Sequence, residues 1–142
     1  MKKSKLIIDY DYDFRLAGIV SSARSYKLAW EVNRALGIQL IRQPDLTVGF
    51  KGKPGVEKQF VYYSYDGVIN RLKLFKNKPM DYEQGKYFLV PEFPRFDFIF
   101  LTASENPEYH TMTIQLLKEI GSIELVTPLS MENLRSKENF IF

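Results

Sequence analysis

The stretch that decides the fold runs from Phe60 to Phe75 and reads Phe-Val-Tyr-Tyr-Ser-Tyr-Asp-Gly-Val-Ile-Asn-Arg-Leu-Lys-Leu-Phe. Two runs rich in aromatic and β-branched residues flank Asp66-Gly67, a dipeptide that favours a two-residue type I′ turn. The pattern predicts an antiparallel hairpin in which Tyr65 lies opposite Val68. Alternate side chains of this hairpin are then expected to face the core, and they are Val61, Tyr63, Tyr65, Val68, Leu72 and Leu74.

Further elements are expected on both sides of this hairpin. Alternation predicts strands over 5–14 and 16–20, and an apolar stripe predicts a helix over 22–36 that ends at Gly37. Further strands are expected over 38–42, 46–50, 87–90, 96–102 and 123–126, a helix capped by Asn106 over 107–120, and a short helix from 128 to about 137. The chain is therefore predicted to form a single α+β domain over residues 1–142, with an antiparallel or mixed sheet and about three helices packed mainly on one side.

Composition limits the class of protein. Hydrophobic residues make up 45% and charged residues 26% of the 142 residues, which is typical of a globular domain with a core. No run approaches the roughly 20 apolar residues that a membrane helix needs, and no signal peptide is expected. The absence of cysteine is compatible with the cytosol. We therefore expect a cytoplasmic protein without a membrane partner.

Charge is distributed unevenly along the chain. Residues 1–86 carry a net charge of +7 and residues 87–142 one of −4, within a total of +3. The two parts can pair within the fold or across a homo-oligomer, or the basic part can bind a polyanion.

Motifs for most enzyme classes are missing from the sequence. With no cysteine and a single histidine, His110, one chain cannot assemble a zinc site of nitrogen and sulfur ligands, and no cofactor or metal site is predicted. His110 is expected to be a partly exposed helix residue. The run Asp9-Tyr-Asp-Tyr-Asp13 is the remaining enzyme lead, but Phe14 and Val20 occupy the positions where a calcium loop needs glycine and glutamate. An acidic-site hydrolase is therefore only the third hypothesis, after two kinds of binding protein.

The leading hypothesis is a binding protein that uses the outer face of the first helix. Tyr26 and Trp30 are helical neighbours on the side opposite the apolar stripe, together with Arg34. Exposed aromatic residues beside arginine are typical of protein interfaces, so a homo-oligomer or another cytosolic protein is the expected partner. Alternatively, a loop or the C-terminal segment, which ends in Phe140-Ile-Phe142, covers these rings within one chain.

The second hypothesis is a single-stranded nucleic-acid binder that uses the outer face of the hairpin. Aromatic rings there would stack on bases, and cations would contact phosphates. The candidate residues are Phe60, Tyr62, Arg71, Lys73 and Phe75.

The stretch Val90-Pro-Glu-Phe-Pro-Arg-Phe-Asp-Phe98 resembles the motif of the bacterial IPExxxVDY family. Pro91 and Glu92 match that motif, Val90 replaces its isoleucine, and Phe96, Asp97 and Phe98 replace Val-Asp-Tyr. The resemblance extends to the opening strand, the first helix and Gln43-Pro-Asp45, and it implies no assigned activity. We interpret the motif as a structural bend between two strands rather than a catalytic Glu92–Asp97 pair.

Overall fold

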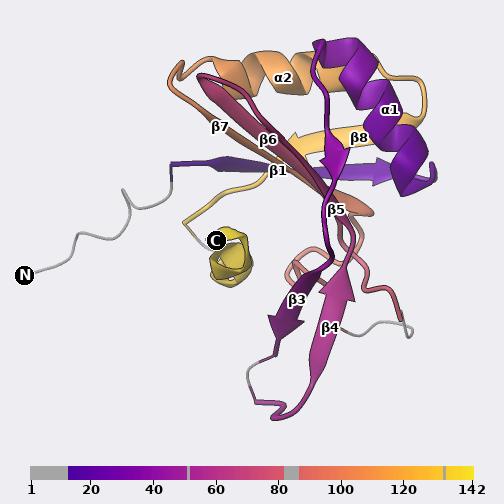
Figure 1. The fold of residues 1–142 in the computed structure, drawn as a ribbon, viewed down its shortest axis with the longest axis vertical. Helices are drawn as coiled ribbons and strands as arrows, with labels where there is room; N and C mark the ends of the chain where they lie inside the picture. Colours follow the sequence, from indigo (N-terminus) through magenta and orange to yellow (C-terminus); the bar gives the residue numbers. More distant parts are fainter. Residues whose placement is uncertain (1–12, 51, 82–86, 133) are drawn as a thin grey trace, which may run out of the picture.

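The fold is built on a six-stranded antiparallel sheet with the strand order β2-β5-β6-β7-β1-β8 (Figure 1). The computed structural model describes residues 13–50, 52–81, 87–132 and 134–142. A separate two-stranded sheet, β3-β4, extends from the main sheet in Figure 1. The elements are β1 (Arg15–Ser21), α1 (Ser25–Leu36), β2 (Ile41–Arg42), β3 (Leu46–Gly49), β4 (Glu57–Phe60), β5 (Tyr62–Asp66), β6 (Asn70–Lys76), β7 (Phe98–Ser104), α2 (Tyr109–Lys118), β8 (Ile123–Pro128) and the 3-10 helix η2 (Arg135–Phe140).

The central hairpin, β5-β6, forms as predicted, but its register differs. Tyr65 lies opposite Leu72 rather than Val68, and residues 67–69 form the connection, closed by a hydrogen bond from the Gly67 N–H to the Asn70 carbonyl. Gly67 does not adopt the positive φ that a type I′ turn requires. Because the register differs by an even number of residues, the side chains keep their predicted faces, but Val68 is fully exposed instead of buried.

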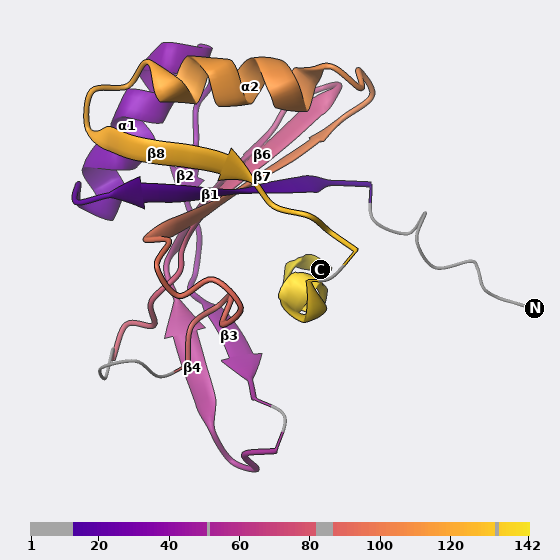
Figure 2. The ribbon, with the colours of Figure 1, turned by 180° about the vertical axis from the view of Figure 1, so that it is seen from behind.

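One face of the main sheet is covered by α1 and α2, which lie side by side above it in Figures 1 and 2. Leu28, Ala29 and Val32 of α1 pack on this face, as the helical stripe predicted. On α2 the buried residues are Thr113, Ile114 and Leu117, whereas Met112 is exposed. Leu72 and Leu74 of β6 belong to the same core, which confirms the predicted inner face of the hairpin.

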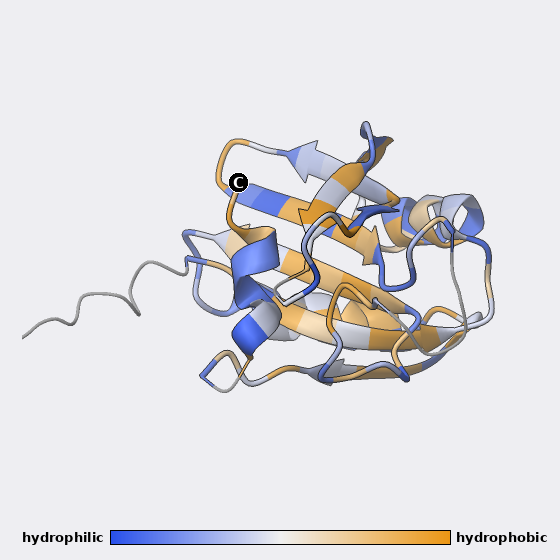
Figure 3. Ribbon diagram, turned by 90° about the horizontal axis from the view of Figure 1, so that it is seen from below, coloured by the Kyte–Doolittle hydropathy of each residue, from blue (hydrophilic) through white to orange (hydrophobic). Residues whose placement is uncertain are grey.

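The opposite face of the sheet carries a second core, which the sequence did not predict. Phe60 and Phe75 lie in it, together with Leu89, Val90 and Phe140 from the connections and the C-terminal segment. The third helix, η2, lies on this side of the sheet, so only two of the three helices share one face (Figure 2). Hydrophobic residues run along the strands in Figure 3, whereas the turns of η2 are largely hydrophilic.

Several of the predicted elements differ from the elements in the structure. β7 is buried at every residue up to Ala103, so its hydrophobicity does not alternate. The expected strand over 87–90 is irregular structure, although Phe88, Leu89 and Val90 are buried. The last helix begins at Arg135 rather than at residue 128, which belongs to β8. The predicted strand over 5–14 lies mostly outside the described residues.

Candidate functional site

The outer face of α1 is the largest exposed aromatic feature predicted from the sequence. Side chains of Tyr26 and Trp30 are 66% and 55% exposed, and the guanidinium carbon of Arg34 lies 4.9 Å from the centre of the Trp30 ring. This stacking stabilises the orientation of the indole. The structure therefore confirms that helical spacing places the two rings opposite the buried stripe.

Charged residues of both signs lie on α1 and on the segment that contacts it. Arg24, Lys27 and Arg34 are exposed on or beside α1. The hydroxyl of Ser122 donates a hydrogen bond to Glu31 of α1, which holds the connection between α2 and β8 against this helix. Exposed Glu119 and Glu124 flank Ser122 in the sequence. A basic aromatic surface and an acidic segment thus adjoin at α1.

The C-terminal segment does not cover the α1 face, and packs on the second core instead. Phe140 lies in that core, and the Phe142 ring makes edge contacts with Tyr62 and Phe75, at centroid distances of 5.8 and 6.3 Å. The alternative explanation for Tyr26 and Trp30, intramolecular burial by this segment, is therefore wrong.

The same packing changes the predicted nucleic-acid face. Phe60 and Phe75 are fully buried, so neither ring can stack on a base, and that part of the prediction is wrong. Tyr62 is half-buried and stacks on Phe75, with ring centroids 5.1 Å apart. The period-two pattern could not reveal this burial, because it assumed a sheet with one wet face.

The two cations of the predicted nucleic-acid face already have partners within the chain. Arg71 forms an ion pair of 3.1 Å with Asp13, and the Lys73 ammonium lies 4.1 Å from the centre of the Phe142 ring. Burial, together with the nearby charge of Arg71, lowers the pKa of Lys73. Asp13, the last residue of the acidic run, is thus balanced by a basic side chain; Asp9 and Asp11 lie outside the described residues.

Glu92, in the motif that resembles the IPExxxVDY family, anchors the C-terminal segment. Its carboxylate accepts hydrogen bonds from the Ser136 N–H at 3.0 Å and the Ser136 hydroxyl at 2.8 Å. Burial alone would raise the pKa of Glu92, but the hydrogen bond from the Ser136 hydroxyl and those from nearby backbone N–H groups together outweigh it and lower this pKa. Glu92 therefore connects the motif to the start of η2.

Asp97 and Asn77 hold the rest of the motif in place. The Asp97 carboxylate accepts a hydrogen bond of 2.9 Å from the Ser21 N–H, at the irregularity between β1 and β8. Fully buried Asn77 donates from its amide to the carbonyls of Phe93 and Phe96 and accepts from the Val90 N–H. Glu92 and Asp97 thus each bind backbone groups of other segments, which supports a structural role for the motif. Val90 and Phe96 lie in the second core, Phe98 lies in the first, and Pro91 is exposed.

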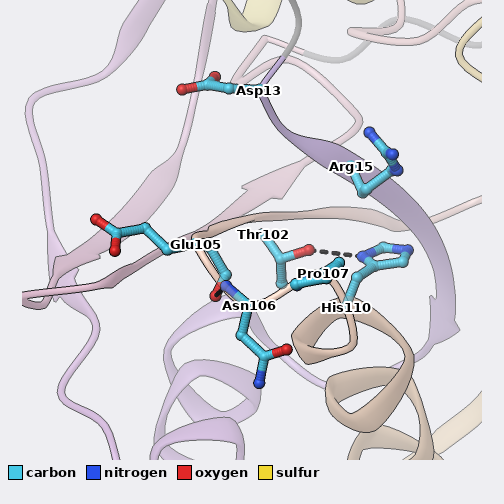
Figure 4. Close-up of a pocket in the computed structure, with 8 residues that line it drawn as sticks. Asp13, Arg15, Thr102, Glu105, Asn106, Pro107 and His110 are labelled. Atoms are coloured by element: carbon cyan, nitrogen blue, oxygen red, sulfur yellow. Dashed lines mark hydrogen bonds between the residues drawn. The ribbon is translucent and has the colours of Figure 1, made fainter.

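One cluster of polar residues was missed by the sequence analysis. His110, on the first turn of α2, lies 2.6 Å from the Thr102 hydroxyl through its Nδ1 atom. Both residues line a pocket of about 440 Å³ at the end of the sheet, with Arg15 of β1 on its wall (Figure 4). Burial lowers the pKa of His110, and the positive charge of Arg15 lowers it further. Both effects favour the neutral form of the imidazole.

Comparison with protein-family models and with curated proteins finds no relative of this chain. No protein-family model and no curated protein matches the chain, so the resemblance to the IPExxxVDY family stays a prediction.

Within the described residues, no three His, Asp or Glu side chains are grouped as a metal site would need. The helices of the described part of the chain are too short and too polar to cross a membrane.

Proposed function

We propose that this chain is a binding protein that associates with a second copy of itself through the outer face of α1. The observation that carries the proposal is the exposure of Tyr26 and Trp30 beside Arg34. Aromatic rings and arginine are the residues that contribute most to interfaces, and tyrosine and tryptophan bury a large area with little loss of side-chain entropy.

The distribution of charge favours a second copy as the partner. Arg24 and Lys27 lie beside the aromatic pair, and exposed Glu119 and Glu124 belong to the segment that adjoins α1. A two-fold axis beside α1 would bring the basic surface of each copy onto the acidic segment of the other. One such interface would therefore contain two contacts between a basic surface and an acidic segment.

The interface must extend beyond one helix. The helix has 12 residues and is about 18 Å long, so the area of its outer face is smaller than the roughly 800 Å² that each partner of a specific dimer buries. We therefore place Tyr26 and Trp30 at the centre of the contact and the charged residues at its rim.

Trp30 is the only tryptophan in the chain, which makes the proposal directly testable. We expect light scattering to show an oligomer whose dissociation on dilution moves the Trp30 emission to longer wavelength, as the ring enters water. The substitution Trp30→Ala should weaken association by about 30-fold or more, the effect of losing a residue at the centre of an interface. Because the ring is exposed in the single chain, the unfolding free energy of the monomer should change by less than about 1 kcal/mol.

A matched control is Ile69→Ala, since Ile69 is 53% exposed on the remote β5-β6 connection. This variant should associate like the wild type. A wild-type protein that remains monomeric at millimolar concentration would refute self-association. An oligomer that is unaffected by Trp30→Ala would place the contact on another surface.

A further inference from the structure

The pocket at the start of α2 combines residues from three segments that are distant in the sequence. Arg15 comes from the beginning of β1, Thr102 and Ser104 from the end of β7, and His110 from α2. Arg15 and Thr102 lie opposite each other in the β1·β7 ladder, so their side chains leave the same face of the sheet. The volume of about 440 Å³ is in the range of small-molecule sites.

Arg15 has a charge that the described residues do not neutralise. Its guanidinium makes one hydrogen bond, of 3.4 Å, to the Phe14 carbonyl, and forms no ion pair with a carboxylate of the described segments. The nearest acidic residue in the sequence, Asp13, pairs with Arg71 instead. Figure 4 shows Asp13 and Glu105 on one side of the pocket and Arg15 with His110 on the other.

His110 contributes a hydrogen-bond donor to the same side of the pocket. We assign the bond at Nδ1 to donation from the Thr102 hydroxyl, which leaves the proton of the neutral ring on Nε2. Thr102 is 2% exposed, and this bond from a buried residue holds the ring in one orientation. The imidazole then offers an N–H group beside a charged guanidinium.

We propose that this pocket binds a small molecule through an oxyanion, a phosphate or carboxylate group, held between the guanidinium of Arg15 and the Nε2–H of His110. Arginine supplies a planar pair of donors that matches an oxyanion, and the pocket provides room for the rest of the ligand beside Ser104 and Pro107. This inference is independent of the α1 face, which lies on another helix.

His110 is the only histidine in the chain, so its imidazole signals in NMR spectra report on this pocket alone. The probes are sulfate, whose charge is constant between pH 5 and 8 and which mimics phosphate, and acetate, which represents carboxylates. Chloride at equal ionic strength is the reference. We expect sulfate, acetate or both to shift the His110 signals with saturation and to raise the pKa of His110, because a bound anion stabilises the imidazolium. A rise of about 1 corresponds to tenfold tighter binding by the protonated form.

The direction of this pH dependence is set by the groups that line the pocket. Its charged groups are Asp13, Arg15 and Glu105, and Arg15 opposes protonation of His110 in the free protein. An anion that neutralises Arg15 should therefore bind more tightly at pH 6 than at pH 7.5.

The decisive variant is Arg15→Gln, which should abolish the anion-dependent shift of the His110 signals. Arg42→Gln, which removes the same group from an exposed position outside the pocket, should respond like the wild type. Thermal melts of both variants confirm folding. The inference is overturned if neither anion changes the His110 signals beyond the effect of chloride, or if Arg15→Gln responds like the wild type. If only sulfate or only acetate shifts the His110 signals, that anion shows whether the ligand group resembles a phosphate or a carboxylate.

Discussion

Gly18 is the position at which the second core allows no side chain. It lies in the middle of β1, which is paired on both sides by β7 and β8. The Phe96 ring covers it: a Cβ atom built on Gly18 would lie 2.4 Å from one ring carbon of Phe96 and 2.6 Å from two others. Such distances are far inside van der Waals contact, so Gly18→Ala requires the ring to move.

The Phe96 ring has little freedom to do so. It is 1% exposed, and its backbone carbonyl accepts a hydrogen bond of 2.9 Å from the buried amide of Asn77. The next residue, Asp97, is tied through its N–H to the Ile19 carbonyl of β1. Overpacking of this kind costs about 1–3 kcal/mol, whereas replacing glycine by alanine in a strand gains about 0.5–1 kcal/mol. We expect Gly18→Ala to lower the unfolding free energy by about 1–2 kcal/mol and the melting temperature by about 2–8 °C.

Urea titration and thermal melts followed by circular dichroism measure this loss. Gly49→Ala is the control, because a Cβ at that strand position meets no atom within 4 Å. In a Phe96→Ala background, Gly18→Ala should cost nothing, since the ring that it displaces is gone. A Gly18→Ala variant as stable as the wild type, or an equal loss in both backgrounds, would refute the contact as the reason for glycine.

Two further predictions concern the polar groups of the motif. Asn77→Ala removes the amide that donates to the buried Phe96 carbonyl and accepts from the Val90 N–H, so it should lower the unfolding free energy by about 2–4 kcal/mol; a loss below about 1 kcal/mol in urea titration would contradict the inferred role. The pKa of Glu92 is lower in the folded chain than its usual value of 4.5, so its contribution to stability is present above pH 4.5 and is lost as the pH falls through the folded value. In Glu92→Gln the pH dependence of stability between pH 5 and 3 should be weaker than in the wild type, and an unchanged dependence would argue against the Ser136 contact.

The two candidate sites differ in how far the sequence could predict them. Tyr26, Trp30 and Arg34 lie within three turns of one helix, so the helical period alone placed them on one face, and the structure confirms that face as exposed. Arg15, Thr102 and His110 are instead brought together by the pairing of β1 with β7 and by the docking of α2. No local pattern connects such residues, and His110 alone was expected to be only a partly exposed helix residue.

By itself, the sequence determined the elements whose signals are local: the β5-β6 hairpin and α1 up to its left-handed end at Gly37. It also placed a helix after Asn106, but α2 begins at Tyr109 rather than at residue 107, and Asn106 accepts from the Glu108 N–H in the turn before the helix instead of capping it. It also determined which hairpin side chains share a face, because alternation survives an even change of register. Only the tertiary structure decided that the other face is buried as well. The segments that cover it, the motif and the C-terminal residues around Phe140, carry no regular period, and they pack there because Phe60, Phe75 and Ile99 would otherwise remain in water.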